Sequence, residues 1–279
     1  MKFKQVGLII LFVIDAITIA AQTPYFSIDE LPDATYYLPA PPDTTGALFD
    51  YDVSQFHWGK SMRDSDRGKQ AVDDANGIYT VMCQNFSQAF GMPISPEHTP
   101  AIYEMIACSL KTTSNATSKC KNHYRRVRPF QYFDEEMYTG ETLSDTSYPS
   151  THAAKGWIMA LLLGEINPDA QQELAVKGYE YGQSRVIVGA HWQTDVDAGR
   201  LVGSITCSLL HSNSTFLAHM DAAKAEFASL INDAVIDTHP DSDAGDNHLQ
   251  WYTIDGRPAH ITTPGIIVGS NGKKVLHIE

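Results

Sequence analysis

The stretch THAAKGWIMALLLGEI, residues 151–166, decides the fold, because apolar side chains fall on every face of the helix that it would form. A helix that is hydrophobic all round lies in the core of a protein. Asn167 and Pro168 follow directly, and a proline disfavours helical geometry in the residue before it. The sequence therefore predicts a buried helix that ends near residue 166.

Further helices are predicted on both sides of this one. Apolar residues recur three and four apart along several segments, as they do on one face of a helix. Helices are predicted over residues 63–90, 96–112, 168–188, 192–213 and 215–233. Strand-like patterns are nearly absent before residue 250, so we expect an all-α fold, a compact helical bundle.

The N-terminus has the pattern of a signal peptide. Within residues 1–21, Lys2 and Lys4 precede an apolar run, and small residues follow it. The run is shorter than the roughly 20 residues that a membrane span needs. No integral membrane span is therefore expected in the mature protein.

Composition divides the rest of the chain into four segments. Residues 22–50 are rich in proline and are expected to be an extended lead-in, and residues 51–235 form the helical domain. Residues 236–249 are polar and acidic, as in a linker. Residues 250–279 contain β-type runs separated by an Asp-Gly and an Asn-Gly pair, which are turn signals, so a short β-type tail is expected.

Three short segments, in a fixed order, carry the residues suited to chemistry. They are Lys121-x6-Arg128-Pro129, Pro149-Ser150-Thr151-His152 and Ser184-Arg185-x5-His191-x3-Asp195. Arginine forks and a lysine ammonium suit the oxygens of a phosphate, and a neutral imidazole is a competent nucleophile towards phosphorus. The set favours phosphoryl transfer through a histidine. There is no HExxH motif and no Cys/His cluster with ligand spacing, so neither a metal nor another cofactor is expected.

The spacing within these segments predicts separate tasks for the two histidines. His191 and Asp195 are four apart, which puts them on one face if the stretch is helical, so Asp195 would fix the tautomer of His191. His152 follows Ser150 at the start of the buried helix, where backbone N–H groups favour an anion. His152 would then be placed to protonate a leaving group.

Each segment also has an ordinary interpretation. Lys121 and Arg128 lie in a basic run with Arg125 and Arg126, and such runs are usually solvated faces. Ser150 could simply cap a helix. The ordered set, taken together, favours the functional interpretation.

The set resembles the pattern of the phosphatidic acid phosphatase type 2 and vanadium haloperoxidase superfamily. The chain is most similar to the soluble branch, the bacterial class A non-specific acid phosphatases, and the likeness extends to HYRRVRPF, SYPSTH and GYEYGQSRVIVGAHWQTDVDAGR. The resemblance implies phosphate binding by Lys121, Arg128, Ser150, Thr151 and Arg185, and catalysis by His191 as nucleophile, His152 as acid and Asp195 as orienting partner of His191.

One residue departs from the family pattern, which has Gly where this chain has Thr151. Threonine does not easily adopt a positive φ, and it adds a branched side chain near the phosphate. A backbone N–H is kept, so we expect activity with an altered rate or substrate preference.

The resemblance implies an acid phosphatase that hydrolyses small phosphomonoesters through a phosphohistidine. The signal-peptide pattern predicts a periplasmic, secreted or cell-surface location, and the residue inventory predicts that no metal is needed. Three alternatives use the same site: a phosphotransferase, a vanadate-dependent haloperoxidase and a non-catalytic phosphate-binding exported protein. The formal net charge of −13, without a broad basic stripe, excludes nucleic acid as a partner. The sequence leaves open whether the protein is a homo-oligomer. The tail resembles segments that sort exported proteins through type IX secretion machinery.

The four cysteines leave two interpretations open. An exported protein meets an oxidising compartment, and a Cys108–Cys120 bridge would close a short loop. Alternatively, Cys83 and Cys207 lie in apolar surroundings, as reduced core residues do.

Overall fold

The computed structural model describes residues 22–141, 143–144 and 146–236, and four short strands near the C-terminus. The expected signal peptide, residues 1–21, lies outside the described residues, and so does the expected linker beyond Ile236.

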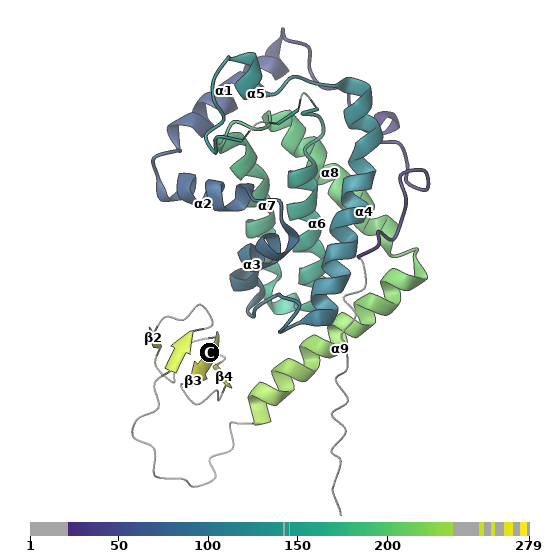
Figure 1. The fold of residues 1–279 in the computed structure, drawn as a ribbon, viewed down its shortest axis with the longest axis vertical. Helices are drawn as coiled ribbons and strands as arrows, with labels where there is room; N and C mark the ends of the chain where they lie inside the picture. The colour runs from purple at the N-terminus through teal and green to yellow at the C-terminus, as the bar shows by residue number, and fades with distance from the viewer. Residues whose placement is uncertain are drawn as a thin grey trace, which may run out of the picture.

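The described part of the chain is mainly helical (Figure 1). The α-helices are α1 (Ala47–Ser61), α2 (Asp66–Ala75), α3 (Tyr79–Phe90), α4 (Pro100–Tyr124), α5 (Pro129–Tyr132), α6 (Thr151–Ile166), α7 (Gln171–Ile187), α8 (Gln193–Leu210) and α9 (Ser214–Ile236), with 3-10 turns at Ala34–Tyr36 and Pro168–Ala170. The predicted all-α class is confirmed.

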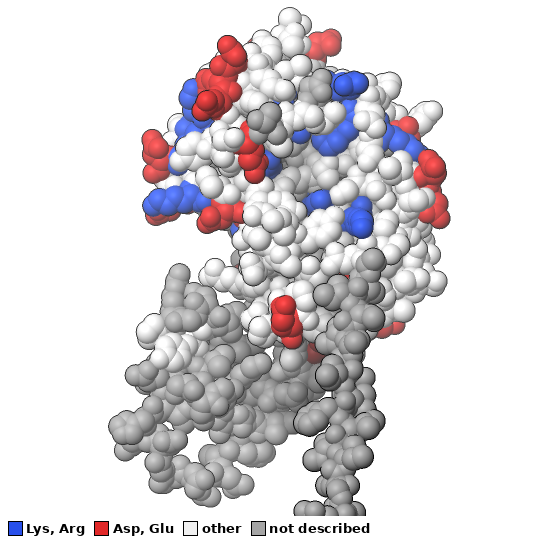
Figure 2. Space-filling model, viewed as in Figure 1, with Lys and Arg blue, Asp and Glu red and all other residues white. Residues whose placement is uncertain are grey.

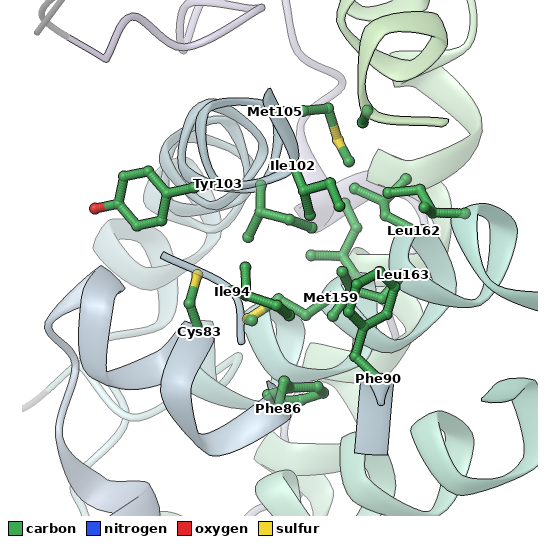
Figure 3. Close-up of a cluster of buried hydrophobic side chains, with 14 of the residues drawn as sticks. Cys83, Phe86, Phe90, Ile94, Ile102, Tyr103, Met105, Met159, Leu162 and Leu163 are labelled. Atoms are coloured by element: carbon green, nitrogen blue, oxygen red, sulfur yellow. The ribbon is translucent and has the colours of Figure 1, made fainter. Parts of the chain in front are cut away.

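Helix α6 lies inside the bundle, with α4, α7 and α8 packed around it (Figure 1). The prediction of a buried helix over residues 151–166 is confirmed at both ends. In the core shown in Figure 3, Met159 and Leu163 of α6 share one cluster with Ile102 of α4 and Phe90 of α3. All four side chains are fully buried, so the core continues unbroken from α6 to its neighbours.

Two glycines let neighbouring helices approach the start of α6 closely. A Cβ on Gly156 would lie 2.6 Å from Cδ1 of Tyr181 in α7, and one on Gly199 of α8 would lie 2.4 Å from the carbonyl oxygen of Ser150. Both distances are far too short for real carbon atoms. The absence of a side chain at these positions therefore places Tyr181 and the backbone of α8 against the first turns of α6.

The region predicted as one helix over 63–90 is two helices that meet at Asn76–Ile78. The side chain of Asn76 accepts a hydrogen bond from the backbone N–H of Ile78 at 2.9 Å, which stabilises a turn in place of a helix. Gly77 follows Asn76 directly, and a glycine disfavours a continuous helix. As shown below, the end of α2 created by this turn contacts two residues of the candidate site.

Two further boundaries differ from the prediction. Helix α1 begins at Ala47, inside the segment expected to be extended, after Gly46 with a φ of 96°. Helix α4 does not end near Thr112 but continues to Tyr124. Its Ser and Thr hydroxyls donate to carbonyls four residues earlier, as from Thr112 to Cys108 at 2.9 Å and from Thr113 to Ser109 at 2.8 Å. Polar side chains satisfied in this way do not interrupt the helix.

Of the two interpretations left open for the cysteines, the Cys108–Cys120 bridge does not fit the structure. Both residues lie in α4, and twelve helical residues span about 18 Å, well beyond the roughly 7 Å that a disulfide allows between Cα atoms. All four cysteines are free, and Cys83, Cys108 and Cys120 are buried. The alternative of reduced residues is the correct one.

The C-terminal tail forms β-structure, as predicted. Antiparallel strands β1 (Trp251–Thr253), β2 (Pro258–Ala259), β3 (Gly265–Gly269) and β4 (Lys274–His277) pair in the order β2-β1-β3-β4. None of the helices in the described residues has the length and apolarity to cross a membrane.

Candidate active site

The candidate site lies where several helix ends converge. Lys121 belongs to the last turn of α4, and Arg185 to the last turn of α7. Arg128 directly precedes α5, and Ser150, Thr151 and His152 lie at the start of α6. His191 and Asp195 lie on either side of the start of α8. Figure 2 shows lysine and arginine side chains around a hollow in this part of the surface. The residues singled out from the three sequence segments therefore lie together.

The ring of His191 has one nitrogen towards a cation and the other towards an acceptor network. Nη1 of Arg128 lies 3.0 Å from Nε2 of His191. A guanidinium only donates hydrogen bonds, so Nε2 must be the unprotonated nitrogen that carries the lone pair. The proton of the neutral ring is then on Nδ1, which lies 3.3 Å from Oγ of Ser147 and 3.4 Å from Oδ2 of Asp195. Nε2 is therefore the nitrogen with the lone pair, which attacks an electrophile only after it gives up the hydrogen bond from Arg128.

Asp195 is held by more partners than the sequence indicated. Its Oδ2 accepts hydrogen bonds from the hydroxyl of Ser147 at 2.5 Å and from the backbone N–H of Trp192 at 2.9 Å. Helix α8 begins at Gln193, so His191 precedes the helix and the two residues do not share a helical face. A helix-start turn, closed by the Asp195 carboxylate, brings them together.

Arg126 completes this network, although its basic run had the pattern of a solvated face. Its side chain is only 9% exposed and bridges two buried carboxylates, Oδ1 of Asp195 at 2.6 Å and Oδ2 of Asp52 at 2.7 Å. Asp52 also accepts from the backbone N–H and the hydroxyl of Thr194. The carboxylate that faces His191 is thereby fixed from α1, α8 and the loop after α4.

The cations at the site change one another's protonation. Burial, followed by the neighbouring Arg128, lowers the pKa of Lys121 to about 7. The ammonium donates to the carbonyl of Thr146 at 2.5 Å. Burial first, and then Arg128, Lys121 and Arg185, hold the pKa of His191 well below its ordinary value of 6.5. A neutral His191 therefore persists into acidic solution.

His152 is oriented by α2 and α7. Its Nε2 lies 2.6 Å from the backbone carbonyl oxygen of Asp74, and its ring stacks on Tyr181 with centroids 4.8 Å apart and planes 2° apart. A carbonyl only accepts, so Nε2 carries a proton and Nδ1 is the nitrogen left for a ligand. Burial, and then Arg185, hold the pKa of His152 well below 6.5. A bound anion would oppose the effect of Arg185 and favour the protonated ring.

Arg185 is a buried cation whose hydrogen bonds are incomplete. Its side chain is 4% exposed, and Nη1 lies 3.4 Å from the carbonyl oxygen of Ala75. Nε has no hydrogen-bond partner among the described residues. A buried guanidinium with an unsatisfied donor is unfavourable on its own, and an anion in the hollow would satisfy it.

The start of α6 contributes backbone groups to the site. The hydroxyl of Ser150 caps the helix by accepting from the N–H of Ala153 at 3.2 Å, and the N–H of Ser150 donates to the carbonyl of Asp195. Thr151 lies within α6 and is not among the residues with positive φ. Its hydroxyl pairs with that of Thr117 in α4 at 2.7 Å. The strain expected from replacing glycine by threonine is therefore not present.

A cavity opens beside these groups. It has a volume of about 620 Å³ and is lined by Val72, Ala75, Asn76, Gly77, Ile78, Thr139 and Glu141. The carbonyl of Ala75 in its wall is the one that Arg185 contacts. The cavity thus has room for an organic group, and Ala75 joins it to Arg185 and so to the cations and histidines of the candidate site.

Ser147, Arg126, Asp52 and Asp74 are the site residues that sequence reasoning missed. Ser147 lies inside the SYPSTH stretch, and Arg126 lies between Lys121 and Arg128, so the motifs themselves contain a signal for both. Asp52 and Asp74 come from distant helices, and no local spacing links them to the motifs.

Several known proteins are similar to this chain in sequence. Residues 103–216 match the family model described as the PAP2 superfamily. The chain is 39% identical over 207 residues to the non-specific acid phosphatase of Providencia stuartii, which covers 71% of this chain and 82% of that protein. It is 37% identical over 223 residues to the non-specific acid phosphatase of Salmonella typhimurium, covering 78% of this chain and 89% of that protein. The acid phosphatase of Zymomonas mobilis is 30% identical over 198 residues, which are 70% of this chain and 75% of that protein.

Proposed function

Since the chain belongs to the PAP2 superfamily and is a relative of bacterial non-specific acid phosphatases, we propose that it is an exported acid phosphatase that hydrolyses phosphate monoesters through phospho-His191 and without a metal. The observation that carries the mechanism is the position of His191. Its Nε2 lies beside Arg128, whereas Nδ1 faces Ser147 and Asp195.

In the first step, the lone pair of His191 Nε2 forms a bond to phosphorus while the ester P–O bond breaks. Lys121, Arg128 and Arg185 neutralise the phosphoryl oxygens, which is the task that a divalent ion performs in metal-dependent phosphatases. The leaving oxygen takes a proton from Nδ1 of His152. Asp195 stabilises the positive charge on the phosphorylated ring, and Arg126 and Ser147 hold that carboxylate in place.

In the second step, water attacks phosphorus and the P–N bond breaks. His152, now neutral, takes a proton from the water, so both histidines return to their starting states and phosphate is released. An alcohol in place of water would give phosphotransfer. The 620 Å³ cavity beside Arg185 has room for either the leaving group or such an acceptor.

We expect kcat/KM to fall as pH rises, first below pH 6.5 as His152 loses its proton, and again above about 7. Lys121, with a pKa of about 7, loses its charge in that range, and His152 must bind a proton against a lowered pKa. His191 stays neutral in acid because its pKa is also lowered, so acidic solution does not inactivate the nucleophile until well below pH 6.5. The pH dependence of kcat/KM, with inhibition by inorganic phosphate measured at each pH, tests this directly. Activity that increases steadily above pH 7 would contradict it.

The proposed function is tested by release of p-nitrophenol from p-nitrophenyl phosphate at acidic pH in excess EDTA. We expect full activity in the chelator and an acid-labile phosphoenzyme after rapid quenching. Activity lost in EDTA and restored by a divalent ion would exclude the metal-free mechanism. An inactive wild-type chain would instead favour a phosphate-binding protein, and peroxidase activity that appears only with vanadate would favour the haloperoxidase.

Replacement of Thr151 by Gly is expected to change kcat/KM by no more than a few-fold. The Thr151 hydroxyl bonds to Thr117, and its backbone is helical, so neither contributes strain to the site. The variant loses one hydrogen bond worth about 1 kcal/mol and some helix propensity, so its Tm should drop by several degrees. Thr117→Val, which removes the same hydrogen bond without altering α6, is the matched control. A tenfold change in kcat/KM for Thr151→Gly alone would show that the threonine acts on the substrate.

Export and sorting belong to the same proposal. The signal-peptide pattern of residues 1–21 supports export, and the β-type tail supports recognition by secretion machinery. Cells that express the full chain and cells that express a chain without residues 250–279 would be fractionated side by side. The comparison would separate the effect of the signal peptide from that of the tail.

A further inference from the structure

We propose that Asp74 is a positioning residue for the catalytic acid: its buried carboxylate fastens the end of α2 to α7, so that the last carbonyls of α2 hold His152 and Arg185. This inference rests on the proposed phosphatase function. Asp74 does not touch the phosphate in the mechanism above, and none of the three motif segments contains it.

The carboxylate of Asp74 is 1% exposed and has two partners on one helix. Oδ1 pairs with Nζ of Lys177 at 2.8 Å, and Oδ2 accepts from the hydroxyl of Ser184 at 2.7 Å. Lys177 and Ser184 are seven residues apart in α7, about two turns, so they lie on the same face. Arg67 adds a second attachment of α2, because its Nη2 donates to the Ser184 hydroxyl at 3.0 Å. The end of α2 is therefore fixed against α7 by charged and hydroxyl groups.

This attachment controls two backbone carbonyls at the end of α2. The last carbonyls of a helix have no partner within it and carry its partial negative charge. The carbonyl of Asp74 lies 2.6 Å from Nε2 of His152, and that of Ala75 lies 3.4 Å from Nη1 of Arg185. Both are therefore used to orient cationic or proton-carrying groups of the site.

The contact to His152 decides which nitrogen faces the substrate. With Nε2–H bound to the Asp74 carbonyl, the catalytic proton must be carried by Nδ1. A shift of about 1 Å at the end of α2 would break the hydrogen bond and allow the ring to leave its stacking position on Tyr181. Loss of the Asp74 carboxylate is therefore expected to impair proton donation to the leaving group more than attack by His191.

Leaving-group dependence distinguishes this role from a general loss of structure. A p-nitrophenolate leaves with little need for a proton, whereas the alkoxide of glycerol phosphate needs one, and general acid catalysis contributes about 10²–10⁴-fold. For Asp74→Asn we expect kcat/KM to fall about 100-fold with glycerol phosphate and at most about tenfold with p-nitrophenyl phosphate. Any weakening of Arg185 affects both substrates alike and cancels in the ratio.

Further variants keep the test valid if one of them fails to fold. Lys177→Met should reproduce the unequal loss, and Lys177→Arg should restore most of it. Glu165→Gln is the matched control, because Glu165 likewise holds Lys224 and His211 from other segments, at 2.8 and 2.9 Å, away from the site. If Asp74→Asn does not fold, as judged by its thermal transition, Lys177→Met decides.

Equal losses with the two substrates, or no loss, would overturn the positioning role. Failure of the proposed function is distinguishable, because the wild-type chain would then hydrolyse neither substrate.

Discussion

Replacement of His191 by Ala is expected to lower kcat for p-nitrophenyl phosphate by about 10⁴-fold or more. Removal of a covalent nucleophile has an effect of this size in hydrolases, because no other group forms the intermediate. The groups that His191 contacts through its ring are Arg128, the hydroxyl of Ser147 and the carboxylate of Asp195, and none of them can replace Nε2 as a neutral nucleophile. The measurement is release of p-nitrophenol at acidic pH, with the thermal transition recorded for each protein.

His98→Ala is the matched control for this variant. His98 is exposed and bonds to Ser95 just before α4, at the opposite end of that helix from Lys121. It should retain wild-type activity. A His191→Ala protein that folds and keeps more than a few per cent of wild-type kcat would contradict nucleophilic catalysis by His191.

Replacement of Arg185 by Met is expected to lower kcat/KM by about 10³–10⁵-fold, the range found for arginines that stabilise a transferred phosphoryl group. The same change should leave Tm unchanged or raise it. Arg185 is a buried cation with an unsatisfied Nε, and replacement of a poorly paired buried charge by an apolar side chain is often stabilising. Activity and stability should therefore move in opposite directions.

Inorganic phosphate supplies the second measurement. It should raise the Tm of the wild-type protein by binding the folded state, and it should raise that of Arg185→Met much less. Arg200→Met is the control, because Arg200 is also a largely buried arginine with an unpartnered Nε but pairs with Asp197 at 2.7 Å. A Tm that drops sharply in Arg185→Met, with phosphate stabilisation intact, would mean that Arg185 serves the fold and not the ligand.

The sequence predicted the positions of the helices best where the signal was local. Helix α6 was recognisable because its apolar residues leave no polar face, and the ordered motifs located His152 at its start. The relation of His191 to Asp195 was predicted as a pair on one helical face. The structure instead has a turn closed by Asp195, because the chain enters α8 only at Gln193. The spacing was informative, although the local geometry assumed for it was wrong.

The remaining errors come from interactions between distant segments. Arg126 seemed solvated because its neighbours in sequence are basic, but Asp52 of α1, which neutralises it, lies 74 residues away. Helix α4 seemed to end at Thr112 because a Ser/Thr-rich segment follows. Those hydroxyls bond back to the helix, and Thr117 pairs with Thr151 across the bundle. Neither compensation is visible in a window of neighbouring residues.

The four thiols have a consequence for the chemical durability of the protein. Burial raises the pKa values of Cys83, Cys108 and Cys120 to about 12 and that of Cys207 to about 11. Because the thiolate is the reactive form, raised pKa values make all four thiols poorly reactive at neutral pH and still less reactive in acid. Peroxides, alkylating reagents and disulfide-exchange enzymes would therefore find almost nothing to attack. We therefore expect the protein to reach its folded form without disulfide formation, which mass spectrometry of the unreduced protein would check.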